Sequence, residues 1–229
     1  MKTSDLGRRI DLHTHSLLSD GVLLPSEIAR RAESLGFKAI AITDHVDHSN
    51  LEWVLNRVQA FQREIERESR EIKVYIGVEI THVPPASIPL LASRARRLGA
   101  QIVVVHGETL VEPVTPGTNH AAVNSPDVDI LAHPGLISLE DCEKASSNGV
   151  YLEISARKGH CLSNGHLAVQ ALKTHAKLVV NTDFHAPEDF IGQEEAYKVA
   201  LGSGLPHEVA VKAVRDWPEE LLKRIEREG

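Results

Sequence analysis

The chain has 229 residues, of which 42% are apolar and few are aromatic, and its net charge is −7. This length and composition suit one α/β domain whose core consists of Leu, Ile, Val and Ala. The acidic balance argues against a surface that grips the backbone of a nucleic acid. Cys142 and Cys161 form no CxxC pair, so neither a disulfide framework nor a thiolate zinc site is expected.

Residues 1–7 lack the apolar run of a secretion signal, and no apolar stretch approaches the length of a membrane span. We therefore expect a cytoplasmic protein without a membrane partner. The sequence leaves the oligomeric state open.

Strand-like and helix-like segments alternate along almost the whole chain. The segments that we expect to be strands are residues 10–14, 39–43, 74–80, 102–105, 129–132, 151–154 and 178–180. Between them we expect helices from Pro25 to the closing Gly36 and over residues 51–71, 87–98, 139–146 and 166–175. This alternation predicts a parallel sheet flanked by helices.

Two or three helices are expected to finish the chain. Asp216 is followed three residues later by Glu219, a capping pattern that predicts a last helix over residues 220–227. The longest segment without a periodic pattern, residues 107–127, contains three prolines and is predicted to be a loop that covers the rim of the domain.

Six of the strand-like segments carry a potential metal ligand near their carboxyl end, in the runs IDLHTH, AIAITDH, VYIGVEITH, QIVVVH, ILAH and LVVNTDFH. A closed barrel brings the carboxyl ends of all its strands to one mouth, whereas an open sheet spreads them along a crevice. We therefore predict a single barrel domain over residues 1–229, with a polynuclear metal site at its rim.

The alternation of side chains along a strand supports this prediction. Residues two apart point the same way, so His13 and His15 can share one ion while Leu12 faces the helices. The same spacing aligns Asp183 with His185. Ligands thus take one face and apolar residues the other.

A lone histidine is usually structural, and the other histidines are interpreted with this in mind. His166, His175 and His207 lie in expected helical segments and are assigned to the surface or to ordinary packing. His48 and His82 lie beyond strand ends and could have either a structural or a functional role.

Four further polar residues are expected near the site. Asp44 has the wrong parity for the barrel interior and is interpreted as a supporting or helix-capping residue. Glu153 has the right parity and could accept a hydrogen bond from a ligand histidine, or could be a structural carboxylate. Glu108 and His120 on the long loop would reach the site only if this loop closes over it.

Six motifs, DLHTHSLLSDG, AITDH, GVE, VVVH, LAHPG and NTDFH, span residues 11–185, and together they resemble the PHP (polymerase and histidinol phosphatase) family of metal-dependent phosphoesterases. Each motif alone is weak, but the combination is specific. The resemblance implies a distorted (β/α)7 TIM-like barrel with its metal site at the carboxyl ends of the strands. Every ligand position of the family pattern is filled, so an active enzyme is expected.

The resemblance also implies two to three divalent ions. Carried over by position, their ligands are His13, His15, Glu79 and Asp183 for one ion, Glu79, His106 and His133 for the second, and Asp20, His45 and His185 for the third. Mixed imidazole and carboxylate ligands suit Zn, Mn or Fe better than Mg or Ca. Bridging Glu79, together with Asp183 and His185, is interpreted as catalytic.

The expected reaction is hydrolysis of a small phosphomonoester by a metal-bound hydroxide, as in histidinol-phosphate phosphatase, without a protein nucleophile. Arg157 and Lys158 directly follow the sixth strand, and we expect both to contact phosphate, although their charges could also be simply solvated. His160 and Asn164 in the same loop are expected to orient the substrate.

Two other functions compete with this one. An amidohydrolase-type barrel also begins with HxH, but Asp20 shortly after this motif favours the phosphoesterase pattern. A nuclease or RNA-associated member of the family would show basic and aromatic surface, whereas this chain is acidic and has four Phe, three Tyr and two Trp. A small phosphorylated metabolite is therefore preferred as the partner, and a nucleic acid is not expected.

Overall fold

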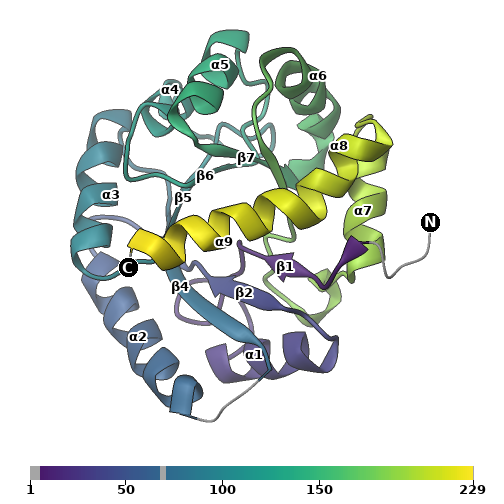
Figure 1. The fold of residues 1–229 in the computed structure, drawn as a ribbon. Coiled ribbons are helices and arrows are strands. Elements are labelled where there is room, and N and C mark those ends of the chain that lie inside the picture. Colours follow the sequence, from purple (N-terminus) through teal and green to yellow (C-terminus); the bar gives the residue numbers. More distant parts are fainter. Residues whose placement is uncertain (1–5, 68–70, 229) are drawn as a thin grey trace.

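The computed structural model describes residues 6–67 and 71–228, which form a parallel β-barrel surrounded by helices (Figure 1). Seven strands follow each other along the sheet in the order β1-β2-β4-β5-β6-β7-β8, and all neighbours pair in parallel. Their bounds are β1 Ile10–Asp11, β2 Ala39–Ile42, β4 Lys73–Ile80, β5 Ile102–His106, β6 Ile130–Ala132, β7 Tyr151–Ser155 and β8 Leu178–Asn181. The short β3, His45–Val46, follows β2 after a two-residue break and also pairs with β4. The predicted TIM-like barrel is thus confirmed.

The barrel is distorted where its last strand meets its first. Because β1 has two residues, side chains replace most of the ladder between β8 and β1: the Oδ1 atom of Asn181 accepts a hydrogen bond from the backbone N–H of Leu12 at 3.0 Å. Beyond this point Thr14 forms an isolated parallel bridge with Phe184, and the backbone N–H of His15 donates to the Phe184 carbonyl at 2.8 Å. The barrel is therefore nearly closed, and the seam lies beside the first ligand motif.

Helices connect the strands on the outside of the barrel. They are α1 Pro25–Ser34, α2 Leu51–Arg67, α3 Ile88–Arg97, α4 Thr118–Val123, α5 Leu139–Asn148, α6 Asn164–Thr174, α7 Gln193–Gly202 and α8 His207–Val211. The last helix, α9 Trp217–Glu228, lies across the end of the barrel at which the strands begin (Figure 1). Within the described ranges, no helix combines the length and the apolar character that a membrane crossing requires.

Alternate residues of the longer strands belong to two separate apolar clusters. Ile40 of β2 packs outward against the helices, whereas Ala41 belongs to the cluster inside the barrel, which Leu221 of α9 closes from below. Leu12, expected to face the helices, lies in this inner cluster together with Ile10. Ile10 and Leu12 are two residues apart, so both point inward by regular alternation, and the chain departs from this alternation beyond the end of β1, where His13 also enters the mouth.

One expected helix and one expected loop differ from the structure. The helix expected over residues 51–71 is described as far as Arg67, residues 68–70 lie outside the described residues, and Glu71 is not helical. The segment 107–127, expected to be an irregular loop, contains α4.

The predicted cap at Asp216 is wrong. A π-helical turn, Lys212–Asp216, joins α8 to α9 without interruption. Pro218 has no N–H, so the Val214 carbonyl cannot receive the regular helical hydrogen bond from that position. It accepts one from the Nε2 atom of Gln193 at 2.9 Å instead, which explains why the helix widens here rather than ending.

Candidate metal centre

Polar side chains gather above the inner apolar cluster, at the carboxyl ends of the strands. Tyr75 and Glu79 both point inward from β4 because they are separated by an even number of residues, and His106 is the last residue of β5. Glu79 and His106 are buried. A strand that is apolar at its start therefore places its polar residue in the mouth of the barrel.

Two of these positions depend on an unusual backbone conformation. Ala132 of β6 points inward, so regular alternation would turn His133 outward toward the helices. The φ angles of His133 and Asp183 are instead 28° and 50°, a region that residues other than glycine rarely adopt, and both side chains enter the mouth. Such strain persists where the surrounding structure enforces it, often at functional sites.

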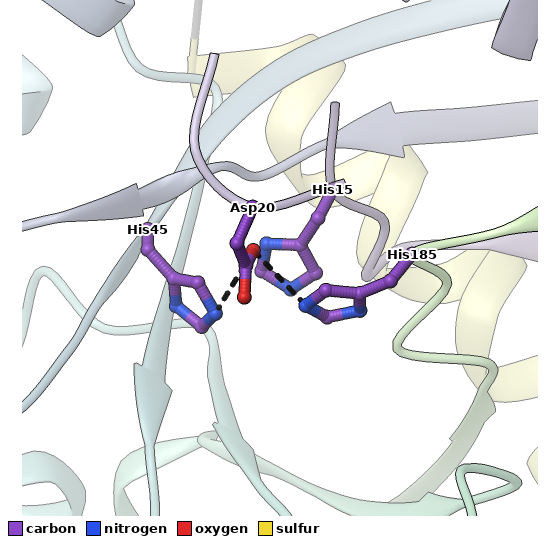
Figure 2. A group of neighbouring side chains, drawn as sticks. All are labelled: His15, Asp20, His45 and His185. Carbon is purple, nitrogen blue, oxygen red and sulfur yellow. Dashed lines mark ion pairs between the residues drawn. The ribbon is translucent and has the colours of Figure 1, made fainter. Parts of the chain in front are cut away.

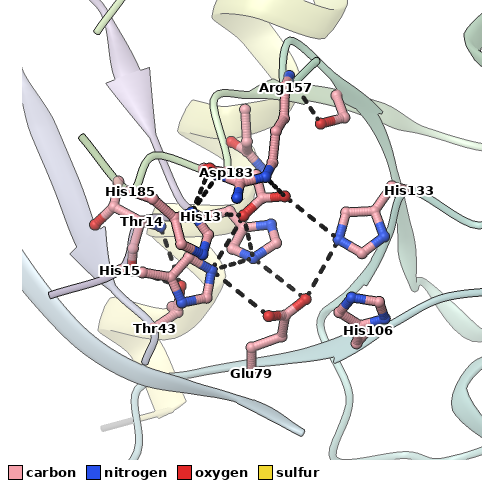
Figure 3. A network of polar contacts seen from close by, with 12 residues as sticks. His13, Thr14, His15, Thr43, Glu79, His106, His133, Arg157, Asp183 and His185 are labelled. Carbon is pink, nitrogen blue, oxygen red and sulfur yellow. Dashed lines mark hydrogen bonds and ion pairs between the residues drawn. The ribbon is translucent and has the colours of Figure 1, made fainter. Parts of the chain in front are cut away.

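The first group of side chains surrounds the HxH motif (Figure 3). The Nε2 atoms of His13 and His15 are 3.0 Å apart, and the Oδ1 atom of Asp183 lies 3.2 Å from the Nε2 atom of His15. Glu79 contributes Oε1, which lies 3.3 Å from the Nε2 atom of His13. The Nδ1 atom of His13 donates to Glu153 at 2.7 Å, so Glu153 orients this imidazole. Of the two roles expected for Glu153, this contact matches that of a hydrogen-bond acceptor for His13.

The second group lies on the other side of Glu79. The side chains of His106, His133 and His160 place their ligand atoms within 4.8 Å of one another. The Oε1 atom of Glu79 is 3.5 Å from the Nε2 atom of His133. His160, expected to orient the substrate, is thus a member of a histidine cluster.

The third group consists of His15, Asp20, His45 and His185, which point toward one another in Figure 2. The Oδ1 atom of Asp20 is 3.1 Å from the Nε2 atom of His185 and 3.5 Å from that of His45. The structure therefore brings the nine predicted ligand positions, Glu79 among them, together in the mouth of the barrel.

Asp44 supports this third group without joining it. Its buried carboxylate accepts hydrogen bonds from the backbone N–H of Ser16, from the hydroxyl of Ser16 and from the hydroxyl of Ser19, each at 2.7 Å. These bonds fix the loop that carries Asp20, which agrees with the supporting role expected from the parity of Asp44.

The charges and unpaired atoms of the cluster fit divalent cations. Both carboxylate oxygens of Glu79 and both ring nitrogens of His133 are buried without a well-directed hydrogen bond among the described residues, although the Nδ1 atom of His45 lies 2.7 Å from the Oε2 atom of Glu79. Burial, and then the neighbouring carboxylates of Glu79 and Glu153, raise the pKa of Asp183 to about 7 despite the attraction of His13. Buried polar atoms are normally satisfied, and several nitrogen and oxygen atoms converging on shared positions match the ligand sets of Zn, Mn and Fe.

A cavity of about 410 Å³ opens onto these groups. Arg157 lines it, and its Nη1 atom donates to the Asp183 carbonyl at 3.0 Å. Lys158 is exposed and is not among the lining residues. The side chain of Asn164 bonds to the backbone of Ser155, so its amide is committed to holding the loop.

The long loop contributes a different residue from those expected. The Oε1 atom of Glu108 accepts hydrogen bonds from Gly117 and Asn119 at the start of α4, and exposed His120 pairs with Asp141. Neither lines the cavity, whereas Glu112 does. Sequence reasoning missed Glu112 because it lies on a segment without any periodic pattern.

The remaining histidines differ in their distance from the cavity, and for His48 and His82 the sequence had left the role open. His82 lines the cavity and adopts a φ angle of 52°, whereas His48 is exposed. His166 lies in α6, His175 follows the end of α6, and His207 lies in α8. None of the three lines the cavity.

Fold and site together define a TIM-like barrel whose strands present clustered metal-ligating side chains at their carboxyl ends. The family model of the PHP domain matches residues 11–161, and the chain belongs to this family of metal-dependent phosphoesterases, whose members bind divalent metals. The chain is 49% identical to the uncharacterized protein MJ1295 of Methanocaldococcus jannaschii, over 95% of this chain and 100% of that protein.

More distant relatives have named functions. A probable phosphatase of Thermoanaerobacter sp. is 26% identical over 95% of this chain and 96% of the relative. Ribonuclease P protein component 3 of Methanosarcina barkeri is 24% identical over 90% of this chain and 85% of the relative. Among solved structures, the histidinol phosphate phosphatase of Lactococcus lactis, complexed with zinc, L-histidinol and phosphate, has a TM-score of 0.58 at 17% identity and covers 87% of this chain and 95% of its own. This last likeness shows a shared fold.

Proposed function

We propose that this chain hydrolyses a small phosphomonoester with the help of two or three divalent ions, Zn, Mn or Fe. The observation that carries the proposal is the convergence of nine imidazole and carboxylate side chains, the buried Glu79 among them, at the floor of a small cavity. The probable phosphatase among the relatives and the phosphatase with the same fold support phosphate ester hydrolysis.

In this proposal one ion would be held by His13, His15, Glu79 and Asp183. A second would be held by Glu79, His106 and His133, and a third by Asp20, His45 and His185. When bound, the ions supply Lewis acidity that makes water a nucleophile near neutral pH and neutralises charge on the phosphoryl oxygens. We propose Glu79, Asp183 and His185 as the catalytic residues. Glu79 lies where the first and second groups meet, and Asp183 and His185 lie next to each other and line the cavity.

The chain's own residues prepare the site for a phosphate. Arg157 presents a guanidinium group at the cavity wall, where it can pair with a phosphate oxygen. Its hydrogen bond to the Asp183 carbonyl limits its motion. The inner apolar cluster and α9 close the barrel below the site, so the substrate enters from the rim alone.

The size of the cavity favours a metabolite over a polymer. A volume of about 410 Å³ suits a ligand of metabolite size. The charge of −7 is unfavourable for a polynucleotide. RNA remains the second candidate because of the relationship to ribonuclease P protein component 3.

A substrate panel tests the proposal. Protein stripped of metal would be reconstituted separately with Mn and Zn and assayed with phosphorylated metabolites, p-nitrophenyl phosphate, bis-p-nitrophenyl phosphate, amide substrates and an RNA oligonucleotide. We expect turnover of at least one small monoester, with kcat/KM above that of the diester and of the RNA. Preferred cleavage of the diester, of RNA or of an amide would overturn the choice of phosphomonoester.

A further inference from the structure

The second group, His106, His133 and His160, contains one histidine, His160, that is not among the nine predicted ligand positions. His160 is 4% exposed, and its ring stacks on that of His133 with centroids 4.1 Å apart. The Nδ1 atom of His160 lies 2.7 Å from the hydroxyl of Thr109, which leaves its Nε2 atom facing the cluster. Ligand histidines typically use their second nitrogen for such an outer hydrogen bond.

A carboxylate from the loop after β5 faces the same group. The Oε2 atom of Glu112 lies 3.2 Å from the Nε2 atom of His106, and its Oε1 atom lies 3.4 Å from the Nε2 atom of His160. Glu112 also lies 3.2 Å from exposed His82, but a pair at an exposed rim contributes little to holding a loop.

The loop of Glu112 rests on the loop of His160. The side chain of Val111 packs against Gly159, where a Cβ atom would come within 3.4 Å of it. Thr109, two residues before Val111, bonds to His160. A ligand that binds Glu112 and His160 at the same time would therefore restrict the motion of both loops.

Buried nitrogens at this position need a partner. Both ring nitrogens of His133 and the Nδ1 atom of His106 are buried without a hydrogen bond within the part of the chain that the structure describes. One cation between these imidazoles and the Glu112 carboxylate would satisfy several of these atoms at once, and three imidazoles with Glu112 and the shared Glu79 form a suitable ligand set for Zn, Mn or Fe.

We propose that His160 and Glu112 join His106 and His133 as ligands of one divalent cation, so that cation binding ties the loop of residues 107–117 to the wall of the cavity. This inference rests on the proposed function, because it concerns the second of the proposed ions. It adds two ligands that lie on loops rather than at strand ends, and it links metal occupancy to the order of a loop beside the substrate cavity.

The test compares metal binding and loop exchange in the full chain. Wild type, Glu112→Gln and His160→Asn would be titrated with Zn in competition with a chelating dye, and hydrogen exchange at residues 108–116 would be followed by mass spectrometry with and without Zn. We expect Zn to slow exchange of this loop in wild type. We expect both variants to bind one Zn at least about tenfold more weakly and to lose the slowing.

Controls separate the possible causes. Glu143→Gln, on the exposed face of α5, is expected to behave as wild type, and His82→Asn is expected to keep the Zn-dependent slowing because its pair with Glu112 is not the cause. If Glu112→Gln does not fold, as judged by circular dichroism, Glu112→Asp keeps the charge and shortens the reach, and a weakened single site is again expected.

Unchanged affinity and unchanged loop slowing in Glu112→Gln and His160→Asn would overturn this inference alone, provided that wild type binds Zn and hydrolyses a monoester. Loss of the slowing in His82→Asn would also overturn it, since the loop would then depend on the ion pair. Wild type that binds no cation, or whose binding is insensitive to Glu79→Gln, would overturn the proposed function as well.

Discussion

The Nδ1 atom of His13 lies 2.7 Å from the Oε2 atom of Glu153, and neither side chain is exposed to solvent. The same Oε2 atom accepts a second hydrogen bond, from the Nδ2 atom of Asn181 at 3.0 Å. Because the carboxylate accepts, the Nδ1 atom of His13 carries a proton, and it is the Nε2 atom that faces His15 and Glu79. A residue of β7 thereby sets the tautomer of a ligand position that follows β1.

Replacing Glu153 by Gln should weaken this orientation without removing a proposed ligand. We expect metal affinity or kcat to fall by roughly 10–100-fold, as is typical for the outer partner of a ligand histidine. Metal titration and steady-state kinetics measure the two effects, with Glu143→Gln as the matched surface control. A variant that matches wild type in both would show that Glu153 has a structural role alone.

Replacing Glu79 by Gln should be more severe. The amide keeps the shape but removes the charge that faces His13, His45 and His133 from the centre of the cluster. We expect loss of turnover beyond the roughly 100-fold upper range for an outer partner, together with fewer ions per chain by elemental analysis. A kcat near that of wild type would exclude Glu79 as a bridge.

Arg157 and Lys158 form a natural matched pair of adjacent cations. Arg157 lines the cavity, whereas Lys158 does not. We expect Arg157→Ala chiefly to raise KM for phosphorylated substrates, because a guanidinium group pairs with phosphate oxygens, and Lys158→Ala to leave KM unchanged. Equal kinetics for both variants would remove Arg157 from phosphate binding, and a raised KM in Lys158→Ala would assign that lysine a role which its position does not suggest.

The floor of the barrel can be weakened without touching the site. Leu221 of α9 is fully buried in the inner apolar cluster, so Leu221→Ala should lower the free energy of unfolding by about 2–5 kcal/mol. Leu90→Ala, at a position on α3 that is 62% exposed, is the control and should cost much less. Urea denaturation measures both. Because Leu221 lies at the opposite end of the barrel, kcat of the folded variant should stay at the wild-type level.

The two cysteines should differ sharply in reactivity. Burial, followed by the nearby Asp141 and Glu143 charges, raises the pKa of the Cys142 thiol from 9.0 to about 12. At pH 8 this thiol stays protonated in the folded chain, whereas Cys161 is exposed. We expect one rapidly reacting thiol per chain with a disulfide reagent, and two after denaturation. Rapid reaction of Cys142 in the folded chain would contradict its burial.

The raised pKa also has a consequence for stability. The unfolded chain releases the Cys142 proton near its ordinary pKa, while the folded chain retains it until about pH 12. The contribution of this thiol to stability is therefore complete below pH 9.0 and is lost as the pH rises through the window up to about 12. Cys142→Ala should flatten the fall of the unfolding free energy in this window, and an unchanged slope would show that other groups cause it.

The linear sequence determined the parallel order of the strands and the residues that their carboxyl ends present. Both follow from local rules, since apolar runs that alternate with amphipathic helices form a parallel barrel, and a residue such as Glu79 or His106 inherits its direction from the parity of its own strand. The full set of nine predicted ligand positions came instead from the resemblance to the PHP family, and their role as ligands stays a prediction.

Only the tertiary structure decided the features that depend on packing between distant segments. Leu12 shares the inward direction of Ile10, so His13 enters the mouth against the parity of β1, and a left-handed backbone turns His133 into the mouth against its parity. Glu112 and His160 reached the cluster because two loops pack on each other, and loop positions follow from contacts that periodicity does not encode. Parity acts within one strand, whereas closure of the barrel and the meeting of its loops are properties of the whole fold.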